Sequence, residues 1–87
     1  MLSEADAYDV AWSFAAKSAG RPYSLRKGAV RGRLESGDIG KKILGCEHSF
    51  WSFVFQMDIP SGVILSPSSV IVLVDPATGR AEYFPGL

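Results

Sequence analysis

The first twenty residues carry apolar side chains at the spacing of one face of an α-helix. The recurring positions are Ala5, Tyr8, Trp12, Ala15, Ala16 and Ala19, and this period of three to four residues is typical of a helix with one buried face. Ala7, Ala11 and Phe14 widen the apolar face. Ser3 can accept a hydrogen bond from a backbone N–H of the first turn, while Gly20 and Pro22 are residue types that end helices. The pattern predicts a helix over residues 3–19, whose many alanines would let its backbone approach a sheet closely.

From residue 50 onward the pattern changes to the two-residue period of β-strands. The strand predicted over residues 50–58 places four large side chains on one face, namely Trp51, Phe53, Phe55 and Met57. Residues 69–75 are apolar on both faces and rich in β-branched side chains, which is typical of a central strand. The turn residues of the 75–79 segment then predict a hairpin whose second strand covers residues 80–84.

The middle of the chain, residues 21–49, is basic and rich in glycine, and its pattern is the least regular. Glycines interrupt any regular element here. An edge strand within residues 25–34 and a short strand or turn over residues 40–45 are the interpretations that this stretch favours.

Together these elements predict a single α+β domain over residues 1–87. One N-terminal helix should pack across a small, mostly antiparallel sheet of three or four strands, against the face that carries Trp51 and Phe53. The opposite face of the sheet is only partly apolar, so it is expected to be either solvated or a contact surface.

Composition narrows the class of protein. The 87 residues contain nine basic and nine acidic side chains, so no overall charge draws the chain to nucleic acid or to a membrane surface. A single cysteine, Cys46, cannot form an internal disulfide, which fits a reducing compartment. No signal peptide and no membrane-spanning apolar run are recognised, so a cytoplasmic location is expected. A core of this size leaves little room for a large enclosed active site, which argues against an enzyme.

Two chemically active side chains lie close together in the sequence, Cys46 and His48. A cysteine nucleophile needs a base, an orienting third group and an oxyanion site, and a structural zinc site needs four ligands. Because the neighbouring sequence supplies neither set, a buried cysteine and a surface histidine are the favoured interpretation. Asp75 is interpreted as a turn residue that binds backbone N–H groups. No catalytic residue, metal or cofactor is therefore predicted.

Positive charge is concentrated in residues 21–42, which hold seven basic and two acidic side chains, a net charge of +5. The candidate partner-binding residues are six of these basic side chains and one aromatic side chain on the face opposite Trp51: Arg26, Lys27, Arg31, Arg33, Lys41, Lys42 and Phe50. Such a segment can meet an acidic protein or track phosphates. The segment holds a single aromatic residue, Tyr23, which provides little for base stacking and favours a protein partner over nucleic acid.

Three stretches resemble the immunity-35 family of bacterial polymorphic-toxin immunity proteins. They are the helix start Ser3-Glu4-Ala5-x-Ala7-x-x-x-Ala11, the strand Trp51-x-Phe53-x-Phe55 and the end Val70-Ile71-Val72-x-Val74-Asp75-x-x-Thr78-Gly79-Arg80. The resemblance covers roughly half of the chain. It implies a small cytoplasmic α+β protein that binds and neutralises a cognate toxin, and it brings no catalytic residue. The same strand and hairpin also resemble PepSY-like domains.

The sequence thus predicts a non-catalytic binding protein of the immunity type with a protein partner. The alternatives are a nucleic-acid-binding module that uses residues 21–42, a PepSY-like regulatory or inhibitory domain, a small enzyme that uses Cys46 and His48, and a homo-oligomer paired through an edge strand.

Overall fold

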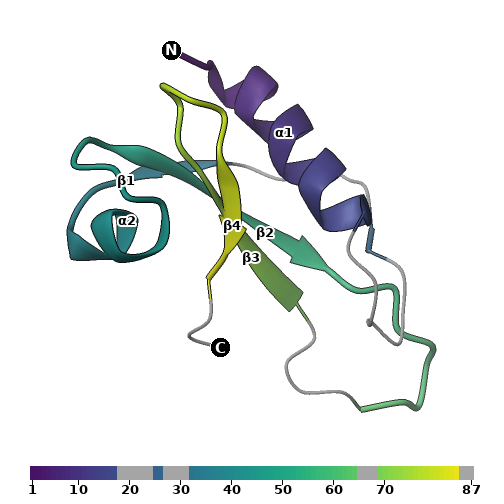
Figure 1. The fold of residues 1–87 in the computed structure, drawn as a ribbon. Helices are drawn as coiled ribbons and strands as arrows, with labels where there is room; N and C mark the ends of the chain where they lie inside the picture. The colour runs from purple at the N-terminus through teal and green to yellow at the C-terminus, as the bar shows by residue number, and fades with distance from the viewer. Residues whose placement is uncertain (18–24, 27–31, 65–68, 85–87) are drawn as a thin grey trace.

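A computed structural model describes residues 1–17, 25–26, 32–64 and 69–84 of the chain. Its elements, in chain order, are α1 (Glu4–Lys17), β1 (Arg33–Glu35), α2 (Asp38–Ile43), β2 (Phe50–Gln56), β3 (Ser69–Val74) and β4 (Ala81–Tyr83) (Figure 1). The predicted α+β class is confirmed. No helix among the described residues has the length and apolar character needed to span a membrane.

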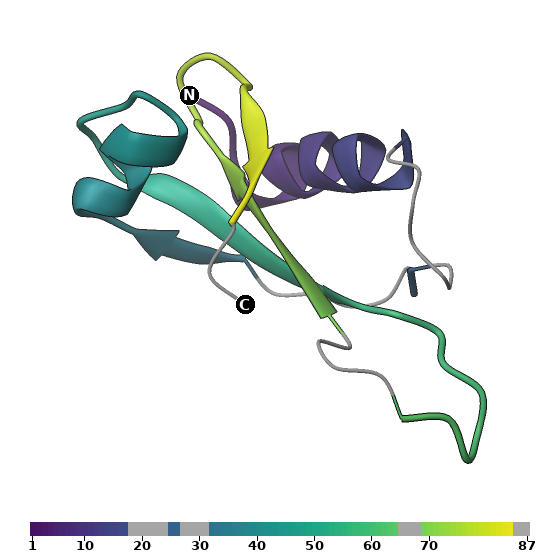
Figure 2. The same ribbon diagram turned by 60° about the horizontal axis from the view of Figure 1, so that its bottom comes forward.

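The four strands form one antiparallel sheet in the order β1-β2-β3-β4. The longest ladder joins β2 to β3, from Trp51 opposite Val74 to Gln56 opposite Ser69. Figure 2 shows α1 running along the sheet, with α2 near β1 and the start of β2. Each strand pairs with its neighbour in the sequence, so the sheet contains no crossover.

One core lies between α1 and the sheet face predicted to receive it. Ala7, Ala11 and Ala15 are fully buried against Phe53, Phe55, Val72 and Val74, and Trp51 packs at the margin of this cluster. These small side chains bring the α1 backbone close to the aromatic rings, as the sequence predicted for its alanines. The predicted face is only partly correct, however, because the buried stripe repeats every four residues through Ala7, Ala11 and Ala15, which leaves Ala5 and Ala16 exposed. At the start of α1, the Asp6 backbone N–H donates to Ser3 Oγ at 3.2 Å, which confirms the cap. The predicted end of this helix lies outside the described residues.

A second, smaller core lies on the opposite face of the sheet, where the sequence indicated a solvated or contact surface. It contains Leu44, Cys46, Phe50 and Leu73. The prediction of a strand or turn over residues 40–45 is wrong, because residues 38–43 form α2. Gly40 does not interrupt this helix but faces Phe50, and a Cβ built on it would lie 2.6 Å from Phe50 Cδ1. The glycine therefore serves close packing of helix on sheet.

The remaining strands agree with the sequence apart from their ends. Of the edge strand expected within residues 25–34, residues 27–31 lie outside the described part of the chain. The described ends contribute β1 and an isolated bridge between Leu25 and Met57. In the hairpin between β3 and β4, Gly79 has a φ of 76° and Asp75 N–H donates to Arg80 O at 2.8 Å. This turn confirms the hairpin that the sequence predicted.

Candidate functional site

The second face of the sheet is only partly covered by α2, and a groove of about 380 Å³ lies beside this helix. Its walls and floor come from β1, α2, β2, β3 and the residue after β4: Arg33, Glu35, Ser36, Ile39, Phe50, Ser52, Val54, Ile71, Leu73 and Phe84. The floor is mostly apolar, and Val54, the β2 lining residue farthest along the strand from Phe50, is 39% exposed. Apolar side chains of this kind, open to solvent in a concave surface, are typical of a contact site.

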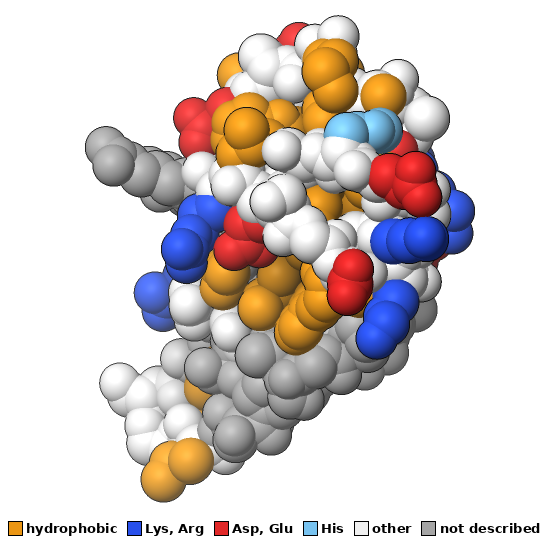
Figure 3. Space-filling view, turned by 90° about the vertical axis from the view of Figure 1, so that its left-hand side faces the viewer, with side chains coloured by type: hydrophobic (Ala, Val, Ile, Leu, Met, Phe, Trp, Pro, Cys, Tyr) orange, Lys and Arg blue, Asp and Glu red, His pale blue; other side chains and the backbone are white. Residues whose placement is uncertain are grey.

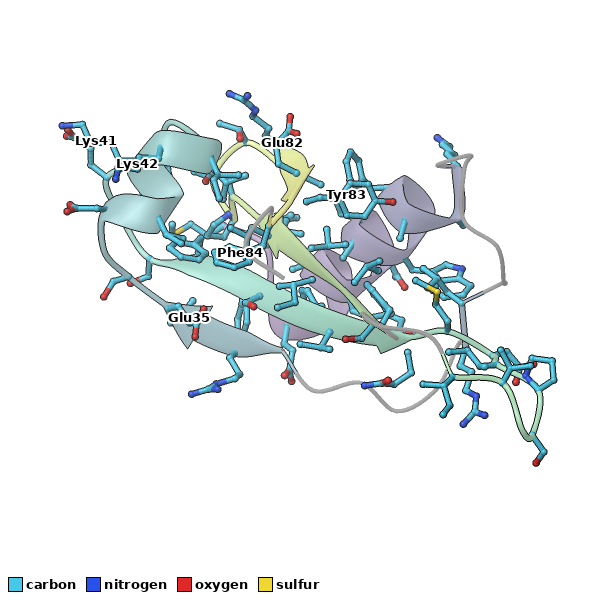
Figure 4. All side chains as sticks on the ribbon, turned by 90° about the horizontal axis from the view of Figure 1, so that it is seen from below. Glu35, Lys41, Lys42, Glu82, Tyr83 and Phe84 are labelled. Atoms are coloured by element: carbon cyan, nitrogen blue, oxygen red, sulfur yellow. The ribbon has the colours of Figure 1, made fainter. Side chains whose placement is uncertain are left out.

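Charged side chains of both signs surround the groove. Arg33 and Glu35 project from β1 on the same face as Phe50. Figure 4 shows Glu35 on β1, Phe84 beside α2, and Lys41 and Lys42 at the outer side of α2. Seen from the side on which α2 and β1 lie, hydrophobic side chains show between acidic and basic ones (Figure 3). The groove thus has an apolar floor and a mixed polar rim, which is the usual composition of a protein interface.

The basic candidates that the structure describes, Arg26, Arg33, Lys41 and Lys42, are not gathered into one patch. Arg26 pairs with Asp58 at 3.3 Å, and its backbone N–H donates to Gln56 O at the end of β2. Lys41 and Lys42 lie on α2, beside the start of β2. The two ends of this seven-residue strand are about 20 Å apart, so Arg26 lies far from both lysines. Lys41 also pairs with Glu47 at 3.4 Å. Lys27 and Arg31 lie outside the described residues, so among the described candidates only Arg33 and Phe50 line the groove.

Phe50 needs a correction. The sequence made it a candidate contact residue on the face opposite Trp51, whereas the residue is 1% exposed. The ring is covered by α2, since Gly40 and Cys46 both lie against it. Phe50 is therefore a core residue that contributes only a small part of the groove floor.

A second constellation joins the loop after α2 to the β3–β4 hairpin. His48 Nε2 lies 2.7 Å from Asp75 Oδ1, and that oxygen also accepts a hydrogen bond from the Ala77 backbone N–H at 2.9 Å. The Cys46 thiol donates to the backbone oxygen of His48 at 3.6 Å. Ligand atoms of the three side chains all lie within 4.8 Å of one another. The side chains of Cys46, His48 and Asp75 therefore form one cluster.

The electrostatics of this cluster do not prepare a nucleophile. Burial raises the pKa of the Cys46 thiol, and the negative charge of Asp75 raises it further, which outweighs hydrogen bonding from the backbone. The sulfur is therefore held as a thiol at neutral pH, whereas cysteine nucleophiles are thiolates. The predicted description of a buried cysteine beside a more exposed histidine is confirmed, since the Cys46 residue is 4% exposed and the His48 side chain 42% exposed.

Sequence reasoning missed the pairing of His48 with Asp75. Asp75 does bind the turn, as predicted, but 27 residues separate it from His48. The signal that could have found the pair is strand register. Val74, the last residue of β3, pairs with Trp51. Asp75 therefore falls opposite Phe50, close to the segment before β2 that contains His48.

The acid stability of the fold should depend on Asp75. Burial alone would raise the pKa of Asp75, but hydrogen bonds from His48, Ala77 and Thr78 and the charge of His48 lower it below the ordinary value of 3.8. A lowered pKa means that the unfolded chain binds more protons than the folded chain as the pH falls past 3.8. The stability supplied by this carboxylate is present above that pH and is lost as the pH falls through the folded-state pKa.

We therefore expect Asp75→Asn, which keeps an acceptor for the Ala77 N–H, to lose less stability on acidification than the native chain. Urea unfolding at pH 6 and pH 3 measures the two losses. If both proteins lost the same free energy of unfolding between pH 6 and pH 3, Asp75 would not contribute to the acid sensitivity of the fold.

Comparisons with known proteins do not assign the chain to a family. The resemblance to immunity-35 proteins therefore rests on the residues of the three matching stretches alone. No protein-family model matches the chain, and neither curated proteins nor solved structures include a significant match to it.

Proposed function

We propose that this chain is a non-catalytic binding protein that holds a protein partner in the groove beside α2. The observation that supports the proposal is the apolar floor around Val54, which lies open on the sheet face between β1 and Phe84. When a partner covers such a floor, its apolar side chains lose contact with water, and truncating side chains at the desolvated centre of an interface usually has the largest effect on affinity. The partner should present apolar side chains to this floor and a charged segment to Arg33 and Glu35 at its rim.

In its finer form, the proposal is that the partner is a toxin or effector that this chain neutralises by covering a surface. Two features favour this form. The resemblance to immunity-35 proteins implies it, and the Cys46 thiol is held in its unreactive form, so a stoichiometric rather than catalytic action is favoured. A nucleic-acid-binding role receives less support, because Arg26 and the α2 lysines belong to opposite ends of β2.

The test starts with the tagged chain as bait in a lysate of its source cells, treated with nuclease. A protein that is retained in an amount equimolar with the bait is identified by mass spectrometry. It is then purified and titrated against the native chain. Loss of the eluate after nuclease treatment would instead point to nucleic acid, and capture of the chain alone would point to self-association.

We expect Val54→Asp to weaken binding of that protein at least about tenfold. An unpaired carboxylate buried in an apolar contact costs more than the 1.4 kcal/mol that corresponds to a factor of ten. Ala16→Asp is the matched control, because it places the same charge on an exposed position of α1, across the sheet from the groove. Unchanged affinity in Val54→Asp, or an equal loss in both variants, would exclude the groove as the contact site.

A further inference from the structure

We propose that Cys46, His48 and Asp75 bind a transition-metal ion of the zinc class. The three side chains come from two segments that meet at one end of the sheet, and their ligand atoms lie within 4.8 Å of one another. Cys46 and His48 alternate on the loop that follows α2, while Asp75 directly follows β3. This inference does not rest on the proposed binding function.

The donor set fits zinc and excludes several other ions. Sulfur, imidazole nitrogen and carboxylate oxygen are the three donor types found in zinc sites, whereas Mg²⁺ and Ca²⁺ take oxygen ligands. Three protein ligands leave a fourth tetrahedral position for water or for a group of a partner. The more exposed His48 side chain lies on the solvent side of the cluster and gives an ion access, while Cys46 and Asp75 hold the buried side.

The side chains must adjust to surround such an ion, because separations of up to 4.8 Å between ligand atoms have to shorten and the shortest contact has to open. Ligand atoms of a tetrahedral zinc site with sulfur, nitrogen and oxygen ligands lie about 3.3–3.6 Å apart, as follows from metal–ligand bonds of about 2.0–2.3 Å. His48 Nε2 and Asp75 Oδ1 are now 2.7 Å apart, so rotation of the half-exposed imidazole would open this contact. The Ala77 N–H already holds the carboxylate in place through Asp75 Oδ1, and hydrogen bonds of this kind usually orient metal ligands.

Charge also favours a cation at this place. A bound divalent ion would be neutralised by the Asp75 carboxylate and the Cys46 thiolate, and the thiol proton would pass to solvent. The ion would fasten the loop after α2 to the hairpin, next to the Arg80 side chain, which already donates to Leu44 O at 3.3 Å.

The chain offers an unusually clear spectroscopic test, because it contains one cysteine and one histidine. The untagged chain, stripped with a chelator and reduced, is titrated with Co²⁺ as a zinc probe. We expect one equivalent to produce a thiolate-to-cobalt charge-transfer band and tetrahedral d–d bands, and Zn²⁺ to bleach both. A His48→Gln variant, which keeps a donor for Asp75, should bind about 100-fold more weakly or worse.

Thermal unfolding gives a second, independent readout. Free Zn²⁺ at 100 times its dissociation constant should raise the Tm by about 10–20 °C for a domain of this size. Glu47→Gln is the matched control, since it removes a carboxylate of the same loop that pairs with Lys41 instead of joining the cluster. It should keep both the charge-transfer band and the shift in Tm.

Absence of the charge-transfer band in the native chain would overturn the proposal, as would an unchanged Tm in Zn²⁺. Retention of the band in Cys46→Ala, with circular dichroism confirming the fold, would also overturn it. None of these measurements involves the groove or its partner, so failure of either proposal leaves the other standing.

Discussion

Replacing Phe50 with alanine should lower the free energy of unfolding by about 3–5 kcal/mol, the usual cost of removing a buried aromatic ring. The side chain is 1% exposed, and it joins Leu73 of the sheet to Leu44 and Cys46 beneath α2. A domain of 87 residues is stable by roughly 4–13 kcal/mol at about 0.05–0.15 kcal/mol per residue. This one substitution therefore removes a large part of the total.

Guanidinium unfolding of the variant and of the native chain measures this loss as a shift of the midpoint. Val54→Ala is the control, because Val54 occupies the same strand and the same face but is 39% exposed. Its cost should stay within about 1 kcal/mol. Similar costs for the two variants would show that α2 does not cover Phe50 in solution, and would return Phe50 to the role of an exposed contact residue.

Replacing Gly40 with valine should cost about 2–3 kcal/mol, although valine forms helices better than glycine. The first carbon of any side chain at this position would lie 2.6 Å from Phe50 Cδ1 and 3.3 Å from Cys46 Sγ. A ring held in a packed core cannot move aside freely, so α2 would have to lift from the sheet. Steric overlap therefore outweighs the gain in helix propensity.

A double-mutant cycle with Phe50→Leu isolates this contact. The shorter leucine leaves space for the new side chain, so the combined loss in Gly40→Val/Phe50→Leu should be smaller than the sum of the two single losses. Additive losses would place the strain elsewhere. A stabilised Gly40→Val variant would mean that propensity alone decides this position.

The elements that the sequence predicted are those whose residues repeat on a regular period. The alternation of Trp51, Phe53 and Phe55 identifies a strand with one core face. The helical period identifies α1, although only Ala15 of the described alanines at the recurring positions lies in its buried stripe. The hairpin was predictable because Asp75 and Gly79 are residues that a tight turn needs. In each case the information lies within a few neighbouring residues.

The candidate sites depend on contacts between distant residues, and the sequence did not reveal them. Gly40 appeared to break regular structure because its use depends on Phe50, ten residues later. The cluster of His48 and Asp75 needs the β2–β3 register, and the exposed groove exists because α2 is too short to cover the whole sheet face. The periodicity of residue types along the chain does not reveal such contacts between distant residues.

The chain-ordered sheet has a consequence for how the protein folds. Each strand pairs with its neighbour in the sequence, so hairpins can add one after another, and pairing between sequence neighbours generally makes folding fast. Contacts between α1 and β4 join opposite ends of the chain instead, since Phe14 packs on Tyr83. Closing that long loop is the entropically costly step, so docking of α1 should be the last event that makes the native state cooperative.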